Sequence, residues 1–101
     1  MSEPSDPPER LMVRRCVISG RVQGVYYRAS AAQRARAAGI TGHARNLPDG
    51  RVEVFACGTA GALEAFIEWL WIGPPAAKVI DVVAEEIELA PRELPREFRT
   101  G

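Results

Sequence analysis

The chain has 101 residues, of which 47% are hydrophobic and 26% are charged. This length suits one compact domain with a single core. Basic and acidic residues each total 13, so there is no net charge to attract a polyanion, which argues against non-specific nucleic-acid binding. No apolar run is long enough to span a membrane, and residues 1–10 lack the pattern of a signal peptide. We therefore expect a soluble cytoplasmic protein with a small ligand.

The first residues differ in composition from the rest of the chain. Met1 to Arg10 is rich in proline and acidic residues, which is typical of disordered segments. We expect a disordered tail over residues 1–11 and one folded domain over residues 12–101. The absence of a coiled-coil pattern or a large apolar tail favours a monomer.

A strand and a helix are predicted on either side of a glycine-bounded loop. Residues Met12–Ser19 mix β-branched residues with arginines and run into Gly20, as a strand does before a turn. Residues Tyr27–Ala38 are rich in alanine and arginine, and Gly39 supplies a helix stop. The buried stripe expected on this helix consists of Ala31, Ala35 and Ala38.

A β-hairpin and a second helix follow. Residues Thr41–Asn46 and Arg51–Cys57 are joined by a Pro-Asp-Gly turn, so they are predicted to pair. Gly73 and two prolines end the next helix. That helix is predicted from apolar residues at helical spacing, namely Leu63, Phe66, Ile67 and Leu70.

The last third of the chain completes the pattern. Val79–Leu89 alternates as a strand, although both of its faces are mixed and the inward one stays open. A short strand near Glu97–Arg99 is expected at a sheet edge. The order is then β-α-β-β-α-β, which predicts an α+β sandwich. We expect four or five antiparallel strands with two helices on one face.

Two cysteines are too few for a disulfide scaffold and lack the spacing of a zinc site. If Val52, Val54 and Ala56 face the core, Cys57 faces the other way, whereas Cys16 points inward. The two thiols should therefore be free and lie on opposite faces of the sheet.

The loop between the first strand and helix has the features of a small-anion site. Gly20 and Gly24 permit backbone angles that let successive N–H groups turn inward into a concave nest. The helix beginning near Tyr27 adds its unpaired N–H groups and the positive end of its dipole. Arg28 supplies a planar fork of donors that matches two phosphate oxygens. The alternative is that Arg28 is an ordinary solvated helix arginine.

Three blocks of the sequence resemble the acylphosphatase family, of the small stand-alone prokaryotic type. They are GRVQGVYYR at residues 20–28, GITGHARNLPDGRVEV at 39–54 and GPPAAKV at 73–79. The resemblance covers roughly Arg14 to Arg99. It implies a ferredoxin-like fold and hydrolysis of the carboxyl–phosphate bond of small acyl phosphates, with no metal or other cofactor. His43 and Ala44 depart from the family pattern, which suggests a looser wall beside Asn46 and leaves substrate choice open.

The resemblance also assigns roles to residues. Arg28 would bind the phosphate, together with a loop of Gln23, Gly24, Val25, Tyr26 and Tyr27. Asn46 would place the attacking water. From the residues alone, Asn46 could equally be a turn residue that caps the hairpin. Its amide cannot take a proton near neutral pH, so it can orient water but cannot act as a general base.

Two other function classes share this element order. A non-catalytic anion-binding or regulatory domain would keep the loop without turnover, like the acylphosphatase-like domain that opens larger carbamoyl-transferring enzymes. An RNA-binding module would display aromatic residues on its central strands, but Arg51–Cys57 offers only Phe55. A lone histidine, His43, favours a structural role over metal binding. The expected partners are therefore an acyl phosphate and inorganic phosphate.

Overall fold

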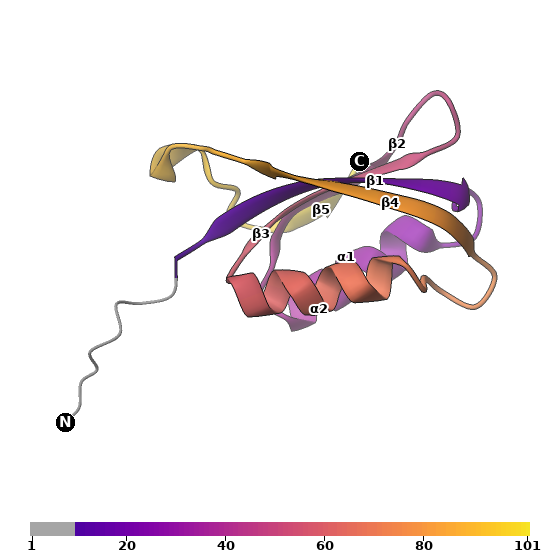
Figure 1. Ribbon diagram of the computed structural model, residues 1–101, viewed down its shortest axis with the longest axis horizontal. Helices are drawn as coiled ribbons and strands as arrows, with labels where there is room; N and C mark the ends of the chain where they lie inside the picture. The colour runs from indigo at the N-terminus through magenta and orange to yellow at the C-terminus, as the bar shows by residue number, and fades with distance from the viewer. Residues whose placement is uncertain (1–9) are drawn as a thin grey trace.

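The computed structural model describes residues 10–101, and its strands form one sheet in the order β4-β1-β3-β2-β5. Both helices cover the same face of this sheet, and the other face is open (Figure 1). The expected β-α-β-β-α-β order and the short strand expected at a sheet edge near Glu97–Arg99 are confirmed, and a short 3-10 turn is added. The elements are β1 (Met12–Arg21), α1 (Tyr27–Ala37), β2 (Thr41–Asn46), β3 (Val52–Gly58), α2 (Ala60–Leu70), β4 (Lys78–Ile87), η1 (Pro91–Glu93) and β5 (Phe98–Thr100).

The sheet is mixed, so the expectation of a purely antiparallel sheet was wrong in one pairing. Strands β1 to β4 pair antiparallel, but β5 runs parallel to β2, with Phe98 beside Gly42. The reason is that β4 and β5 lie at opposite edges of the sheet. The connection between them crosses the sheet instead of forming a hairpin, so no tight turn forces an antiparallel direction.

The predicted helix faces are confirmed except at one residue. Ala31 and Ala35 are fully buried, and Ala32 extends the stripe. Ala38 is exposed, because α1 ends at Ala37 and Ala38 caps it with non-helical backbone angles. Helical periodicity therefore no longer applies there. In α2 the buried residues are Leu63, Phe66 and Leu70, with Ile67 partly buried against the core.

The cysteine assignment is confirmed by the strand register. Cys16 lies opposite Val54, and Cys57 lies opposite Val13, so the two sulfurs belong to opposite faces. Both thiols are free and buried. On β4, Val82 pairs with Ile18 and is buried, which settles the inward face that the pattern left open.

Two further expectations concern the N-terminal tail and membrane-spanning segments. The tail predicted over residues 1–11 lies, for residues 1–9, outside the described residues. Neither helix within residues 10–101 is long and apolar enough to cross a membrane.

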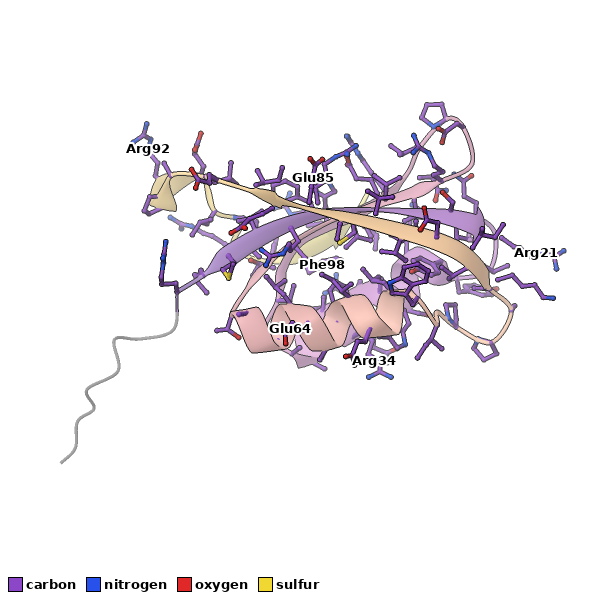
Figure 2. All side chains as sticks on the ribbon, viewed as in Figure 1. Arg21, Arg34, Glu64, Glu85, Arg92 and Phe98 are labelled. Atoms are coloured by element: carbon purple, nitrogen blue, oxygen red, sulfur yellow. The ribbon has the colours of Figure 1, made fainter. Side chains whose placement is uncertain are left out.

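The open face of the sheet is organised around one buried carboxylate, Glu53 of β3. Its oxygens accept from Arg15 Nε at 2.7 Å and Arg45 Nε at 2.6 Å, and His43 Nε2 lies 3.2 Å away. Arg15 also contacts Glu85, which Figure 2 shows on the face away from the helices. Burial by itself raises the pKa of Glu53, but the hydrogen bonds from His43, Arg15 and Arg45 together outweigh it and lower the pKa to about 2. The cluster thus links β1, β3 and β2.

Glu53 should make the stability of the fold depend on pH in the acid range. Its folded-state pKa lies below the unfolded value, so its contribution is fully present above about pH 4.5 and is lost toward about pH 2. We expect Glu53→Gln to lower the free energy of unfolding by on the order of 2–3 kcal/mol near neutral pH. Urea unfolding across this range should show the two proteins converging as the pH falls.

Glu85→Gln is the matched control. The Glu85 side chain is 58% exposed and its one salt bridge within residues 10–101 is with Arg15, so its loss should change stability by less than about 0.5 kcal/mol. Parallel pH profiles for wild type and Glu53→Gln would contradict the assignment.

The two glycines that bound the loop should differ in what they tolerate. Gly20 lies at a shift in the β1–β4 register with φ of +125°, and a Cβ there would lie 2.1 Å from the Lys78 carbonyl oxygen. Gly24 has φ of +76°, but a Cβ would meet no atom within 4 Å. We expect Gly20→Ala to cost more than about 3 kcal/mol and Gly24→Ala only about 1 kcal/mol. Equal losses in thermal unfolding would show that backbone crowding at Gly20 does not matter.

Candidate active site

A cavity of about 380 Å³ opens where the β1–α1 loop meets the first turn of α1. Both the loop and the β2–β3 hairpin lie at the same end of the molecule, at the right of Figure 1. The loop and helix contribute most of the lining, and β5 contributes one residue. The lining residues are Val22, Gly24, Tyr26, Tyr27, Arg28, Ala29 and Thr100.

Backbone N–H groups are the main donors at this cavity. Ser30 N makes the first hydrogen bond of α1, to the Tyr26 carbonyl at 3.0 Å. Within residues 10–101, no acceptor partners the N–H groups of residues 23–29. These groups include the first turn of α1, where the helix dipole is positive. The cavity therefore offers several unused donors to an anion.

The loop backbone is held in a left-handed conformation at two positions. Gly24 has φ of +76°, which glycine adopts readily. Tyr26 has φ of +63° and ψ of +24°, and it is the one non-glycine residue within residues 10–101 with a positive φ. A bulky residue in this region is strained, and such strain concentrates at functional sites. Where residues with positive φ alternate with residues of negative φ, successive backbone N–H groups point to the same side.

Arg28 is half-buried and lines the cavity. Within residues 10–101 no carboxylate pairs with its guanidinium and no acceptor takes its hydrogen bonds. By contrast, Arg45 is exposed but bound to Glu53, and Arg36 donates to the Phe98 carbonyl. Arg28 therefore keeps its full charge and all of its donors for a ligand.

The two adjacent tyrosines point in different directions. Tyr27 is 1% exposed, and its hydroxyl donates to the Leu70 carbonyl at 2.5 Å. Burial raises the pKa of its phenol. Tyr26 is 82% exposed at the rim of the cavity. Tyr27 therefore anchors the start of α1 to the end of α2, and the Tyr26 side chain is open to a ligand.

Gln23 does not line the cavity but fixes its position relative to the hairpin. The side-chain Nε2 donates to the carbonyls of Leu47 and Arg51, both at 2.9 Å. These carbonyls belong to the two ends of the β2–β3 turn. Both amide protons are thereby used, so the Gln23 side chain has no donor left for phosphate. Val25 is partly buried and packs against the core.

Asn46 lies at the last position of β2 and is exposed. It shares a face with Ala44, which is fully buried in the core beneath the helices. Its neighbour Leu47 is the residue that Gln23 holds. Asn46 is therefore on the same side of the sheet as α1 and next to the loop, although it does not line the cavity itself.

The two residues that depart from the family pattern, His43 and Ala44, lie on opposite faces of β2. His43 faces the open side of the sheet, where it stacks on Phe55 with ring centroids 5.5 Å apart. Ala44 has no exposed surface and belongs to the core. Neither residue lines the cavity, and the looser wall beside Asn46 stays a prediction.

Three lining residues were not predicted from the sequence, namely Val22 and Ala29 beside the predicted loop and Thr100, which is far from it in the chain. Thr100 ends β5 and lies beside Ala44 in the parallel pairing with β2. A three-residue strand carries little pattern, and nothing in the sequence indicated which strand it would join. The available signal was the apolar Phe98 two residues earlier, which places Thr100 on the helix-covered face.

The described part of the chain shows no cluster suited to a metal. In residues 10–101, no group of three or more His, Cys, Asp or Glu side chains is arranged to hold an ion. The groups that the cavity offers to a ligand are N–H donors, one guanidinium and the hydroxyls of Tyr26 and Thr100.

Known proteins share both the sequence and the fold. The family model described as Acylphosphatase matches residues 14–100. An acylphosphatase from Xanthomonas euvesicatoria is 55% identical over 87 residues, which span 86% of this chain and 96% of that protein.

Solved structures agree. The acylphosphatase from Bacillus subtilis superposes with a TM-score of 0.84 at 33% identity, covering 89% of this chain and 98% of the other. HypF from T. kodakarensis has a similar region, with a TM-score of 0.77 at 28% identity, covering 89% of this chain but 12% of HypF. With a family match over nearly the whole described domain and relatives of matching length, the chain belongs to the acylphosphatase family.

Proposed function

We propose that this chain hydrolyses the carboxyl–phosphate bond of small acyl phosphates to a carboxylate and inorganic phosphate. The observation that carries the proposal is a cavity where the N–H groups of a strained loop and of the α1 N-terminus meet an unpaired arginine. Such an arrangement suits the equatorial oxygens of a phosphoryl group. Membership of the acylphosphatase family supports the same reaction.

Hydrolysis of an acyl phosphate requires few groups beyond those that bind the phosphate. An acyl phosphate is an activated anhydride with a good carboxylate leaving group, so the protein must position reactants and neutralise charge. In the proposed mechanism the phosphate lies in the nest of the loop, with Arg28 on its oxygens. A water oxygen attacks phosphorus, and the bond from phosphorus to the carboxylate oxygen breaks.

Asn46 orients the attacking water in this proposal. Its amide offers both a donor and an acceptor, but it cannot remove a proton near neutral pH. The water proton passes to the phosphoryl oxygens or to solvent. The hydrogen bonds of Gln23 to the hairpin support this assignment, because they hold β2 beside the phosphate loop.

We also propose that the catalytic unit is residues 12–101, acting as a cytoplasmic monomer without nucleic acid. The two free thiols suit a reducing compartment. The open face carries Glu53 and Glu85 among its arginines, and its Phe55 is stacked on His43. These features do not suit the stacking platform of an RNA-binding sheet.

Arg28→Ala should lower the turnover of benzoyl phosphate by about a hundredfold or more, because it removes donors to the transferring phosphoryl group. Asn46→Asp, which keeps the side-chain shape but loses the amide donor, should lower it by a similar order. The assay follows the chromophoric substrate in the presence of a chelator.

Arg92→Ala is the matched control, because Figure 2 shows Arg92 at the far end of the molecule from Arg21, which precedes the loop. It should stay within about twofold of wild type. A folded wild-type protein without turnover, or full activity in Arg28→Ala, would overturn the proposal.

The rate should depend little on pH near neutrality, because no proposed catalytic group titrates there. We expect kcat to vary by less than about threefold from pH 6 to 8. His43 faces the opposite side of the sheet from α1, so His43→Gln should leave this profile unchanged. A bell-shaped profile that His43→Gln abolishes would assign general-base catalysis to the histidine instead.

A further inference from the structure

Thr100 is positioned to contact the part of a ligand that lies beyond the phosphate. Phe98 of β5 is 3% exposed and belongs to the core, so Thr100, two residues later, points to the same helix-covered face. In the sheet Thr100 lies directly beside Ala44. Asn46 is two residues further along β2 on that same face. Thr100 is therefore the residue of the sheet that lines the cavity, and it pairs with a residue only two positions before Asn46.

The backbone around Thr100 is fixed on both sides. Arg36 of α1 donates twice to the Phe98 carbonyl, from Nη2 at 2.7 Å and from Nε at 3.2 Å. Gly101 N donates to the Ala44 carbonyl at 3.0 Å. The Phe98 ring also packs edge-on against Phe66 of α2. The Thr100 side chain thus projects from a strand held against both helices and β2.

Thr100 is exposed at the cavity wall, and its hydroxyl is accessible to a ligand. The Tyr27 hydroxyl is committed to the Leu70 carbonyl, and the Tyr26 ring lies mostly in solvent at the rim. Within residues 10–101 the Thr100 hydroxyl has no hydrogen-bond partner. It can donate one hydrogen bond and accept two.

The dimensions of the cavity leave room for more than a phosphate. Its volume of about 380 Å³ falls in the range of pockets that enclose a whole small ligand. Arg28 and the N–H groups occupy the loop and helix side, and Thr100 comes from the sheet. A phosphoryl group held by the loop would direct its acyl group toward the sheet side.

We propose that Thr100 is a specificity residue whose hydroxyl accepts a hydrogen bond from the acyl substituent of the substrate. The site then prefers acyl phosphates that carry an N–H donor next to the carbonyl over those that carry a methyl group. This inference rests on the proposed hydrolysis of acyl phosphates. A methyl group of similar size fills the same space but offers no donor, so the hydroxyl makes no bond to the substrate.

Carbamoyl phosphate and acetyl phosphate are the matched probes, because they differ only in an amino group replacing a methyl group. The variant is Thr100→Val, which keeps the branched shape and removes the hydroxyl. We expect the ratio of kcat/KM for carbamoyl phosphate to that for acetyl phosphate to fall by about threefold to tenfold. The ratio should fall because kcat/KM decreases more for carbamoyl phosphate than for acetyl phosphate. Rates are taken after subtracting the enzyme-free reaction.

Thr41→Val is the control, since Thr41 lies opposite Cys57 on the other face of the sheet and does not line the cavity. It should leave the ratio unchanged. A ratio unaffected by Thr100→Val, or an equal loss for both substrates, would overturn the role of Thr100 while leaving the proposed reaction intact. A folded wild-type protein that hydrolyses neither substrate would overturn both.

Discussion

The side-chain amide of Gln23 is the contact on which the geometry of the site depends. The loop that follows β1 and the hairpin between β2 and β3 are separate segments, and this amide joins them through the carbonyls of Leu47 and Arg51. Without it, the register of the sheet would still place Asn46 at the end of β2. The two turns would then have no bond from the Gln23 side chain to fix the distance between Asn46 and the phosphate loop. Preorganisation of this kind is what phosphoryl transfer requires of a protein.

Within the part of the chain that the structure describes, the arginine of the cavity, Arg28, is left without an acidic partner, whereas several other arginines form salt bridges. Arg15 and Arg45 are bound by Glu53 on the open face, and Arg51 is bound by Asp49 in the hairpin turn. Arg28 lies on the other side of the sheet with no acidic partner among residues 10–101. A chain with no net charge therefore still presents a local positive site. The positive end of the α1 dipole adds to this local positive charge. The left-handed backbone at Gly24 and Tyr26 turns the N–H groups of the loop toward the cavity.

Much of this arrangement followed from local patterns in the sequence. The glycine loop, the Pro-Asp-Gly hairpin and the spacing of Leu63, Phe66 and Leu70 each depend on short-range chemistry, and each prediction was confirmed. Features set by contacts between distant segments were not accessible. The parallel direction of β5, and hence Thr100 in the cavity wall, depends on a connection that crosses the sheet. The exposure of Ala38 depends on where α1 ends, and helix ends are the least certain part of a pattern.

The candidate site likewise combines local features, which the sequence predicts, with contacts between distant segments, which it does not. Gln23 was predicted to belong to the phosphate-binding loop, but the bonds of its side chain to the hairpin could not be predicted from the sequence. The central claim is that phosphate binds at the loop and the start of α1. Titration of the isotope-labelled protein with inorganic phosphate, followed by backbone amide chemical shifts, tests it directly. The account predicts saturable shifts concentrated in residues 23–29 that disappear in Arg28→Ala. Shifts centred instead on Arg96 and Arg99, which line a separate cavity of about 550 Å³, would contradict it.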